Sequence, residues 1–319
     1  SSSQETFSIG NYNPLIFNKF ILDGEIIVMP YESLNKDILY FSGIRASVIY
    51  DSNPKIELGF HRSFLSANVK LPNTNFNKTW NMTDAAKLVF EPLFGESKRQ
   101  LDYTIIGTPG FDQWDELISG YILLSFPEDA IKIYVELASD DNRGNFTDLR
   151  AHWDHTLAYT IGINKLWKDI ADYKTLFGLE YFTNRTSNTF NPKFFRGEPN
   201  VISYYSKNMY DFFTYDGRRM GAHAGSSSSD LFLYCGFKKN SSSLFLILSK
   251  EIHGIKSMTN PEIKREISIL YQKEISKKSS IMINFENEHI SNFQFYSSRY
   301  SKSNLFWIGY SYTIGNMLR

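Results

Sequence analysis

Apolar and polar side chains alternate strictly over many short stretches of this chain. In 131–137 the odd positions are apolar, as at Ile133, whereas the even positions carry Lys132, Tyr134 and Glu136. Successive side chains of a β-strand point to opposite faces of a sheet, so a period of two predicts a strand with one apolar and one polar face. Because the pattern recurs along the 319 residues, it indicates an all-β protein.

Turn sequences separate these stretches and predict antiparallel hairpins. Residues 51–54 and 127–129 join the first two pairs, and a meander follows from Leu231. The predicted strands are 43–50, 55–63, 117–126, 130–139, 157–164, 174–183, 231–238, 244–252, 263–273, 279–287, 291–300 and 304–314. The irregular segments 64–116 and 184–230 are expected to be long loops, which often carry function. At roughly 20 residues per strand and connection, the chain could supply about 14 to 16 strands, and the expected barrel has roughly 14 to 18.

A sheet with an apolar outside and a polar inside is the arrangement of a transmembrane β-barrel. Aromatic residues make up 16% of the chain, with 26 Phe and 20 Tyr, and such barrels place many aromatic rings at the two membrane interfaces. The fold expected is therefore a single antiparallel outer-membrane barrel over 1–319. No apolar run approaches the roughly 20 residues of a membrane-spanning helix, but a barrel needs none because only alternate residues meet lipid.

Charge and cysteine content exclude several other classes. The 34 basic and 34 acidic residues give a formal net charge of zero, so we expect no nucleic-acid partner. Cys235 is the only cysteine, which excludes an internal disulfide and a cysteine-based zinc site. The chain opens on Ser1 without an export signal, and we expect a processed or trimmed form.

Charged residues on the polar side of the predicted strands are the first candidates for function. They would be costly in lipid and are expected to face the lumen. These residues are Arg45, Glu57, Arg62, Glu136, Glu180 and Glu286. A structural network of opposite charges is the first explanation for them, and ligand binding is the second.

Enzyme chemistry finds little support in the sequence. His152 and His155 flank Asp154, but on an extended segment the two imidazoles would face opposite sides, which disfavours a metal site. The serines of 226–229 lie beside His223, yet no Gly-x-Ser-x-Gly elbow is present. We therefore expect no enzyme, no metal and no cofactor.

Several short motifs resemble those of the Wzi capsule-assembly family, in the same order along the chain. Gly43-Ile44-Arg45 and 56–63 (Ile-Glu-Leu-Gly-Phe-His-Arg-Ser) resemble its Gly-x-Arg and Glu-Leu-Gly-x-x-Arg-Ser/Thr strands. Tyr134-x-Glu136 with the pair Asp140-Asp141 is similar to its Tyr-x-Glu/Gln strand, which ends in an acidic pair.

Two further motifs extend the resemblance to residue 230. Residues 178–181 (Gly-Leu-Glu-Tyr) are similar to the family's Leu-Glu-Tyr strand. Residues 215–221 (Tyr-Asp-Gly-Arg-Arg-Met-Gly), with Gly225 and Asp230, resemble its Tyr-x-x-Gly-Arg-x-Leu-Gly-His-x-x-Gly loop. His223 lies one place later than that histidine, and only about 40 residues precede Gly43. The N-terminal helical segment that helps to plug the family's barrel is therefore expected to be short or missing.

The resemblance implies an outer-membrane lectin of a Gram-negative bacterium that holds exported capsular or other surface polysaccharide and performs no bond chemistry. Its partners would be that polysaccharide, outer-membrane lipid and other envelope proteins. The residues that the resemblance assigns to polysaccharide binding or to the lumen are Arg45, Glu57, Arg62, Glu136, Asp140, Asp141, Glu180, Tyr215, Arg218 and Asp230. Aromatic faces and planar hydrogen-bonding groups are what sugar recognition requires.

Three alternatives remain open at this point. A porin-like solute channel predicts an open lumen and ion conductance. A barrel that serves as one subunit of a larger envelope complex predicts a protein contact on its outer wall. A soluble β-sandwich or lectin predicts solubility without detergent, and the aromatic residues would then form its core.

Overall fold

The structure is a computed structural model that describes residues 7–11, 13–32, 38–67, 69–70, 77–78, 114–140, 157–170, 173–185, 214–215, 218–219, 224–225, 227–255 and 258–313. The strands are β1 (Phe7–Gly10), β2 (Leu15–Phe17), β3 (Phe20–Glu32), β4 (Ile38–Tyr50), β5 (Lys55–Ala67), β6 (Val69–Lys70), β7 (Asn77–Lys78), β8 (Trp114–Phe126), β9 (Ile131–Asp140), β10 (Leu157–Ile170), β11 (Tyr173–Thr183), β12 (Thr214–Tyr215), β13 (Arg218–Arg219), β14 (Ser229–Lys239), β15 (Ser242–His253), β16 (Glu262–Ser276), β17 (Ser279–Ser291) and β18 (Tyr300–Tyr312).

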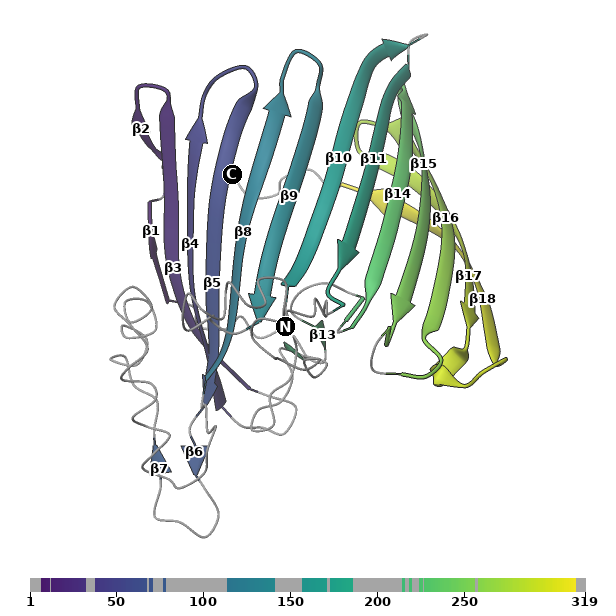
Figure 1. The fold of residues 1–319 in the computed structure, drawn as a ribbon. Coiled ribbons are helices and arrows are strands. Elements are labelled where there is room, and N and C mark those ends of the chain that lie inside the picture. Colours follow the sequence, from purple (N-terminus) through teal and green to yellow (C-terminus); the bar gives the residue numbers. More distant parts are fainter. Residues whose placement is uncertain are drawn as a thin grey trace, which may run out of the picture.

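Fourteen of these strands form one antiparallel sheet that curves from β1 at one edge to β18 at the other (Figure 1). Its order is β1-β3-β4-β5-β8-β9-β10-β11-β14-β15-β16-β17-β18, and β2 also pairs with β3. Two short ladders, β6 with β7 and β12 with β13, lie outside it. Among the described residues the sheet is not closed, since no strand pairs with the outer edge of β18. The predicted all-β antiparallel fold and strand number are confirmed.

The two ends of the sheet differ in the length of their connections. The turns at 51–54, 127–130, 240–241 and 277–278 all lie at one end, which we call the short-turn end. The connections from β5 to β8, from β9 to β10 and from β11 to β14 leave from the other, the long-connection end. Short turns on one side and longer loops on the other are typical of outer-membrane barrels.

Strand pairing separates the side chains into two faces. On one face, which we call the outer face, Leu58 of β5 lies opposite Ile122 of β8, and Ile269 of β16 lies opposite Phe285 of β17. These side chains stay largely exposed, with Ile122 at 50% and Ile308 of β18 at 64%. In the part of the chain that is described, the only buried apolar residues are two alanines. These exposed apolar side chains therefore have no covering layer among the described residues, whereas the outer-face positions Ser42 and Thr183, toward the long-connection end, are buried.

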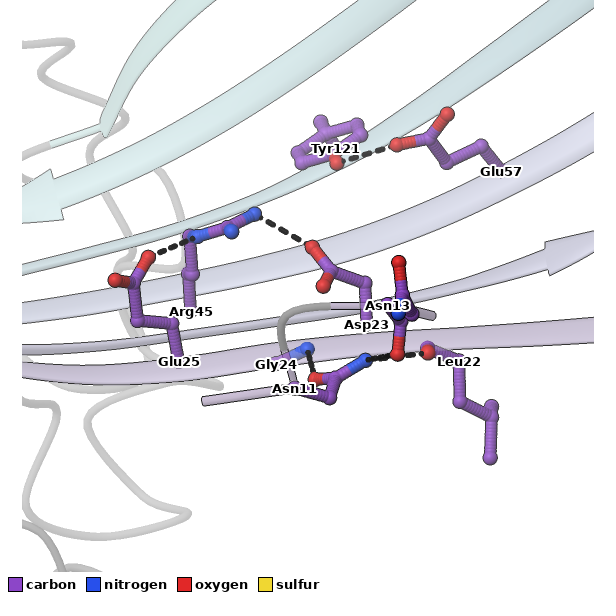
Figure 2. Close-up of polar contacts among 9 residues, drawn as sticks. All are labelled: Asn11, Asn13, Leu22, Asp23, Gly24, Glu25, Arg45, Glu57 and Tyr121. Atoms are coloured by element: carbon purple, nitrogen blue, oxygen red, sulfur yellow. Dashed lines mark hydrogen bonds and ion pairs between the residues drawn. The ribbon is translucent and has the colours of Figure 1, made fainter. Parts of the chain in front are cut away.

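Two short strands, β1 and β2, share the edge of the sheet beside β3, with which both pair antiparallel, and Asn11 lies in the segment between them. Its side-chain oxygen accepts a hydrogen bond from the Gly24 backbone amide at 2.7 Å, and its amide donates to the Leu22 carbonyl at 3.0 Å (Figure 2). The side chain thus satisfies the backbone groups of β3 that a continuous strand would pair with.

One predicted strand is wrong, and others were missed. Residues 292–299 form a turn with a short 3-10 helix (Phe293–Phe295) between β17 and β18. Asn292, Gln294 and Ser298 have φ of 55°, 57° and 64°, which an extended strand cannot accommodate. The sequence patterns also missed β3, because Ile26, Ile27, Val28 and Met29 form a continuous apolar run that hides the period of two.

Candidate functional site

The second face of the sheet, the inner face, carries most of the polar side chains. Across the N-terminal strands, pairing aligns Glu25 with Arg45, and Arg45 with His61. Arg45 Nη1 contacts Asp23 Oδ2 at 2.7 Å and its Nε contacts Glu25 Oε2 at 3.0 Å (Figure 2). The guanidinium thus bridges two carboxylates of the neighbouring strand, as its fork of donors allows. Because Arg45 is 48% exposed, water weakens these contacts.

Tyr121 connects this group to the next strands. Its ring lies against Gly59 of β5, where an added Cβ would come within 2.0 Å of the ring. The Tyr121 hydroxyl donates a hydrogen bond to Glu57 Oε1 at 2.7 Å (Figure 2). His61 also contacts the ring, with centroids 5.5 Å apart. The glycine therefore provides the space that brings a tyrosine hydroxyl to a carboxylate.

The same arrangement occurs at Tyr134 of β9. Its ring lies across Gly162 of β10, where an added Cβ would be 2.1 Å from ring carbon Cζ. Its hydroxyl donates a hydrogen bond to Glu180 on the following strand, β11. Glu180 lies directly opposite Gly162 in the pairing of β10 with β11. One side chain therefore spans three strands.

Tyr234 of β14 makes the corresponding contact from the opposite side. Its ring lies across Gly178 of β11, with an added Cβ only 2.2 Å from the ring. Its hydroxyl donates to Asn164 Oδ1 of β10 at 2.7 Å. Tyr134 thus crosses β10 to reach β11, and Tyr234 crosses β11 to reach β10.

A second charged group lies near the long-connection end of β15–β17. Lys264 Nζ contacts Glu266 at 3.0 Å, Glu251 at 3.3 Å and Glu288 at 3.3 Å. Glu251 is 4% exposed and also contacts His253 Nε2 at 3.1 Å. His253 Nδ1 lies 2.8 Å from the Ala224 carbonyl oxygen. Both imidazole nitrogens are occupied, so this group fixes the strand ends and offers no free base.

Buried hydroxyl and amide groups connect the end of β11 to the segment before β14. Asn184 Oδ1 accepts hydrogen bonds from the Ser228 amide at 2.8 Å and from the Ser228 hydroxyl at 3.1 Å. Asn184 Nδ2 donates to the Gly225 carbonyl at 2.7 Å. Asn184 and Ser228 are 2% and 0% exposed. The Asn184 side chain therefore holds this segment in place.

Most predicted site residues on the strands lie on the inner face. Arg45 and Glu57 occupy it with the partners described above, and Glu136 lies opposite Tyr121. Glu180 shares this face with Asp230, which is opposite Glu251 and 6% exposed. Of these residues, Glu136 is the one for which no hydrogen bond or ion pair with the described part of the chain is recorded. Within the described residues, its carboxylate keeps its acceptor capacity for a ligand.

Arg62 does not share that face, contrary to the prediction. It lies opposite Ile44 of β4 and Ile118 of β8, which belong to the outer face. The strict alternation of β5 from Glu57 onward places odd positions inside and even positions outside. Arg62 is the eighth of the thirteen residues of β5 and is 7% exposed, so other parts of the chain cover most of its side chain.

The remaining predicted residues lie at or beyond strand ends. Asp140 is the last residue of β9 and pairs in register with Leu117, whereas Asp141 lies outside the described residues. Tyr215 of β12 is opposite Arg218 of β13 in the two-residue ladder. The backbone therefore brings Tyr215 and Arg218 together, as a shared role in binding would require.

Sequence reasoning missed the three tyrosines as site-forming residues, and Lys264 as well. Tyr121, Tyr134 and Tyr234 each lie opposite a glycine of a neighbouring strand. That pairing was visible only after strand register was known. The described residues contain no group of three or more His, Cys, Asp or Glu placed to hold a metal ion. No helix among them is long and apolar enough to cross a membrane.

Comparison with known proteins identifies a structural relative but no family. No protein-family model matches the sequence, and no curated protein matches it. The fold is similar to that of Wzi. Wzi is described as an outer membrane protein involved in group 1 capsule assembly in Escherichia coli and as a carbohydrate-binding β-barrel. The TM-score is 0.57 at 11% sequence identity, over 91% of this chain and 54% of Wzi.

This similarity establishes a Wzi-like barrel fold for the sheet and no closer relationship. The chain spans about half the length of Wzi, so the activity of the whole relative does not transfer with the fold. Because the two sequences are only 11% identical, membership of the Wzi family stays an expectation from the motifs.

Proposed function

We propose that the chain is an outer-membrane β-barrel that binds surface or capsular polysaccharide and assists its assembly or attachment at the cell surface. The similarity to Wzi supports this at the level of the fold. The contacts of the inner face support the binding role, and the exposure of the outer face supports the membrane placement.

The observation that carries the membrane placement is the uncovered apolar face. Leu58, Ile122, Ile161, Ile267 and Ile308 lie on strands spread across the whole sheet and are 44–64% exposed. Soluble monomers rarely leave a contiguous apolar surface of this extent open to water. A lipid bilayer covers such a face without any protein layer. The same observation disfavours a soluble β-sandwich, in which these side chains would be the core.

The inner face has the chemistry for binding hydroxyl-rich ligands. Glu57 and Glu180 each accept a hydrogen bond from a tyrosine and keep further acceptor capacity for sugar hydroxyls. Glu136 of β9 lies opposite Tyr121 of β8 on one side and opposite Thr160 of β10 on the other, and it is half-buried. Tyrosine rings beside carboxylates provide both flat apolar surfaces and acceptors, as sugar binding requires.

The experiment combines planar-bilayer recording with polysaccharide pull-down, using detergent-refolded protein and capsular polysaccharide from the source cells. Stable insertion with little conductance, together with retention of polysaccharide, supports the proposal. Glu136→Gln should reduce retention at least tenfold. Glu274→Gln removes the same charge from an exposed carboxylate paired with Lys238 and should leave retention unchanged. Protein that never inserts, or that inserts and retains no polysaccharide, overturns the proposal.

A cation-selective channel is the second candidate, favoured by the charge of the inner face. Among the strand residues whose side chains are described, pairing places twelve carboxylates but six Lys and Arg side chains on this face. The carboxylates are Asp23, Glu25, Glu57, Glu136, Glu180, Asp230, Glu251, Glu262, Glu266, Glu274, Glu286 and Glu288; the cations are Arg45, Lys55, Lys132, Lys174, Lys238 and Lys264. A wall with excess negative charge concentrates cations. Large, steady, cation-selective conductance without polysaccharide retention would establish this function.

A further inference from the structure

Four basic side chains form a row across the outer face of the last four strands. Lys250 of β15 is directly opposite Arg265 of β16, Arg265 is opposite His289 of β17, and His289 is opposite Lys302 of β18. Lys250, Arg265 and Lys302 are exposed, and His289 is partly exposed. We call these four residues the basic row.

Among the described residues, no carboxylate forms an ion pair with the basic row. Like charges directly opposite one another on adjacent strands destabilise a sheet. The outer face of β15–β18 carries no Asp or Glu, as the pairing of the four strands shows. No ion pair is recorded for Lys250, Arg265 or Lys302 within the described part of the chain. On the inner face, by contrast, the neighbouring Lys264 contacts three carboxylates.

The basic row lies at one border of the apolar band. Toward the short-turn end, the row Leu246, Ile269, Phe285 and Phe306 is wholly apolar. The next cation on the outer face of β16 is Lys273, eight residues from Arg265. At about 3.4 Å per residue this separation is roughly 27 Å, close to the apolar band of about 25 Å on transmembrane barrels. The basic row therefore lies where lipid headgroups would meet the protein.

Neighbouring side chains are also typical of a membrane interface. Tyr300 stacks on His289, with ring planes 6° apart and centroids at 5.9 Å. Asn287 donates a hydrogen bond to Asn304 at 2.7 Å in the row just inside the basic row. Aromatic rings and amides gather at the boundary between lipid tails and headgroups. The basic row is thus part of an ordered border and not a set of isolated surface charges.

We propose that the basic row binds the phosphate groups of anionic lipid headgroups at the long-connection end of the barrel. Lysine and arginine are the residues that hold phosphates by charge-assisted hydrogen bonds. On β15 and β16, apolar residues flank the row on both sides, with Leu248 and Ile267 on one and Ile252 and Ile263 on the other. A ligand there needs an anionic group attached to an apolar body, which favours a lipid over an acidic polysaccharide. The inference rests on the proposed membrane placement.

The test compares two triple variants of the refolded protein by native mass spectrometry in a non-ionic detergent. One replaces Lys250→Gln, Arg265→Gln and Lys302→Gln. The matched control replaces Lys132→Gln, Lys174→Gln and Lys238→Gln, which removes three charges from the inner face. The probes are phosphatidylglycerol, whose phosphate is anionic, and zwitterionic phosphatidylcholine. Heat-dependent mobility on gels verifies that both variants fold.

We expect wild type and control to bind phosphatidylglycerol at least tenfold more tightly than phosphatidylcholine, and the outer-face variant to lose this preference. Equal preference in the two variants would overturn the inference while leaving the membrane placement intact. Protein that does not fold in detergent would instead overturn the membrane placement, and the inference with it. If dextran sulfate, added without lipid, binds the row as tightly as phosphatidylglycerol, the site is one for acidic polysaccharide and the lipid assignment is wrong.

Discussion

Tyr134 of β9 reaches over the whole width of β10 to donate a hydrogen bond to Glu180 of β11. Such a reach requires an intervening residue without a side chain, and Gly162 provides it. Fixed hydroxyls and carboxylates on an otherwise water-facing surface lose little entropy on binding a ligand, because their positions are set in advance. The rigidity of the inner face is therefore relevant to the proposed binding function.

Gly162→Ala should destabilise the barrel, because its Cβ would lie 2.1 Å from Tyr134 Cζ. The tyrosine ring must move, and overpacking of this kind costs about 1–3 kcal/mol. The free energy of unfolding in urea, measured in detergent or lipid vesicles, tests this. Gly120→Ala is the control, since its nearest heavy atom is the Gly59 carbonyl oxygen at 3.6 Å. Equal effects of the two substitutions would contradict the packing argument.

Tyr134→Phe and Tyr234→Phe should show energetic coupling. The Tyr134 hydroxyl joins β9 to β11 and the Tyr234 hydroxyl joins β14 to β10, and the loss of each should cost about 1 kcal/mol. A double-mutant cycle measured by urea unfolding should give a coupling of at least about 0.5 kcal/mol for adjacent interacting side chains. Tyr121→Phe removes a hydrogen bond to Glu57 of β5. Its effect on the free energy of unfolding should be additive with that of Tyr134→Phe or Tyr234→Phe. Complete additivity of Tyr134 and Tyr234 would mean that the two bridges act independently.

Lys264→Gln should be among the most destabilising single substitutions on the inner face. It removes the cation shared by Glu251, Glu266 and Glu288 and leaves three carboxylates facing one another. Removing one partner from a largely buried charge group costs about 3 kcal/mol, and Glu251 is 4% exposed. Lys132→Gln is the control because Lys132 is exposed on the same face. Unfolding in urea should show a larger loss of unfolding free energy for Lys264→Gln than for Lys132→Gln. Similar losses for the two variants would show that Lys264 is not a structural cation.

Period-two alternation was enough to predict the strands with one clean apolar face. It assigned Glu57, Glu136 and Glu180 to the inner face because each lies among alternating residues, and register agrees. The wrong placement of Arg62 came from the expectation that every charge avoids lipid, because the alternation of β5 itself puts even positions on the outer face. Alternation missed β3, whose Ile26–Met29 run is apolar on both faces.

Contacts between distant residues could not be predicted in this way. Tyr234 and Asn164 are 70 residues apart, and their hydrogen bond depends on the register of β10, β11 and β14. The basic row likewise needs three successive pairings, because Lys250 and Lys302 are unremarkable as separate surface lysines. Ser228, which belongs to a run of serines without any pattern, is buried and hydrogen-bonded to Asn184. Register is the information that the sequence pattern lacks.

Arg45→Gln should have a small, salt-dependent effect. Arg45 bridges Asp23 and Glu25 but is 48% exposed, so the loss should be below about 1 kcal/mol. Salt screens exposed charges, and at 1 M the screening length falls to about 3 Å. The difference in unfolding free energy between wild type and variant should therefore shrink as salt is raised. A difference that does not change with salt would indicate that packing of the arginine stem, and not its charge, stabilises the strands.

The direction of the strands decides which edges of this sheet can meet. β1 and β2 share one strand position, so the sheet has thirteen successive antiparallel positions, and the first and last run parallel to each other. β3, the second position, runs antiparallel to β18, and both strands have 13 residues. A lipid-exposed sheet edge leaves backbone groups unpaired and does not persist in a bilayer. Antiparallel closure of the sheet on itself therefore requires β18 to replace β1 and β2 beside β3.

Disulfide trapping in lipid vesicles tests this closure. In a Cys235→Ser background, Leu22→Cys of β3 should cross-link with Ile308→Cys or Tyr310→Cys of β18, because even positions on both strands belong to the outer face. Ile9→Cys of β1 should not cross-link with either, since its strand would have been displaced. Efficient cross-linking from Ile9, or none from Leu22 in any register, would show that the edge of β18 pairs with something other than β3.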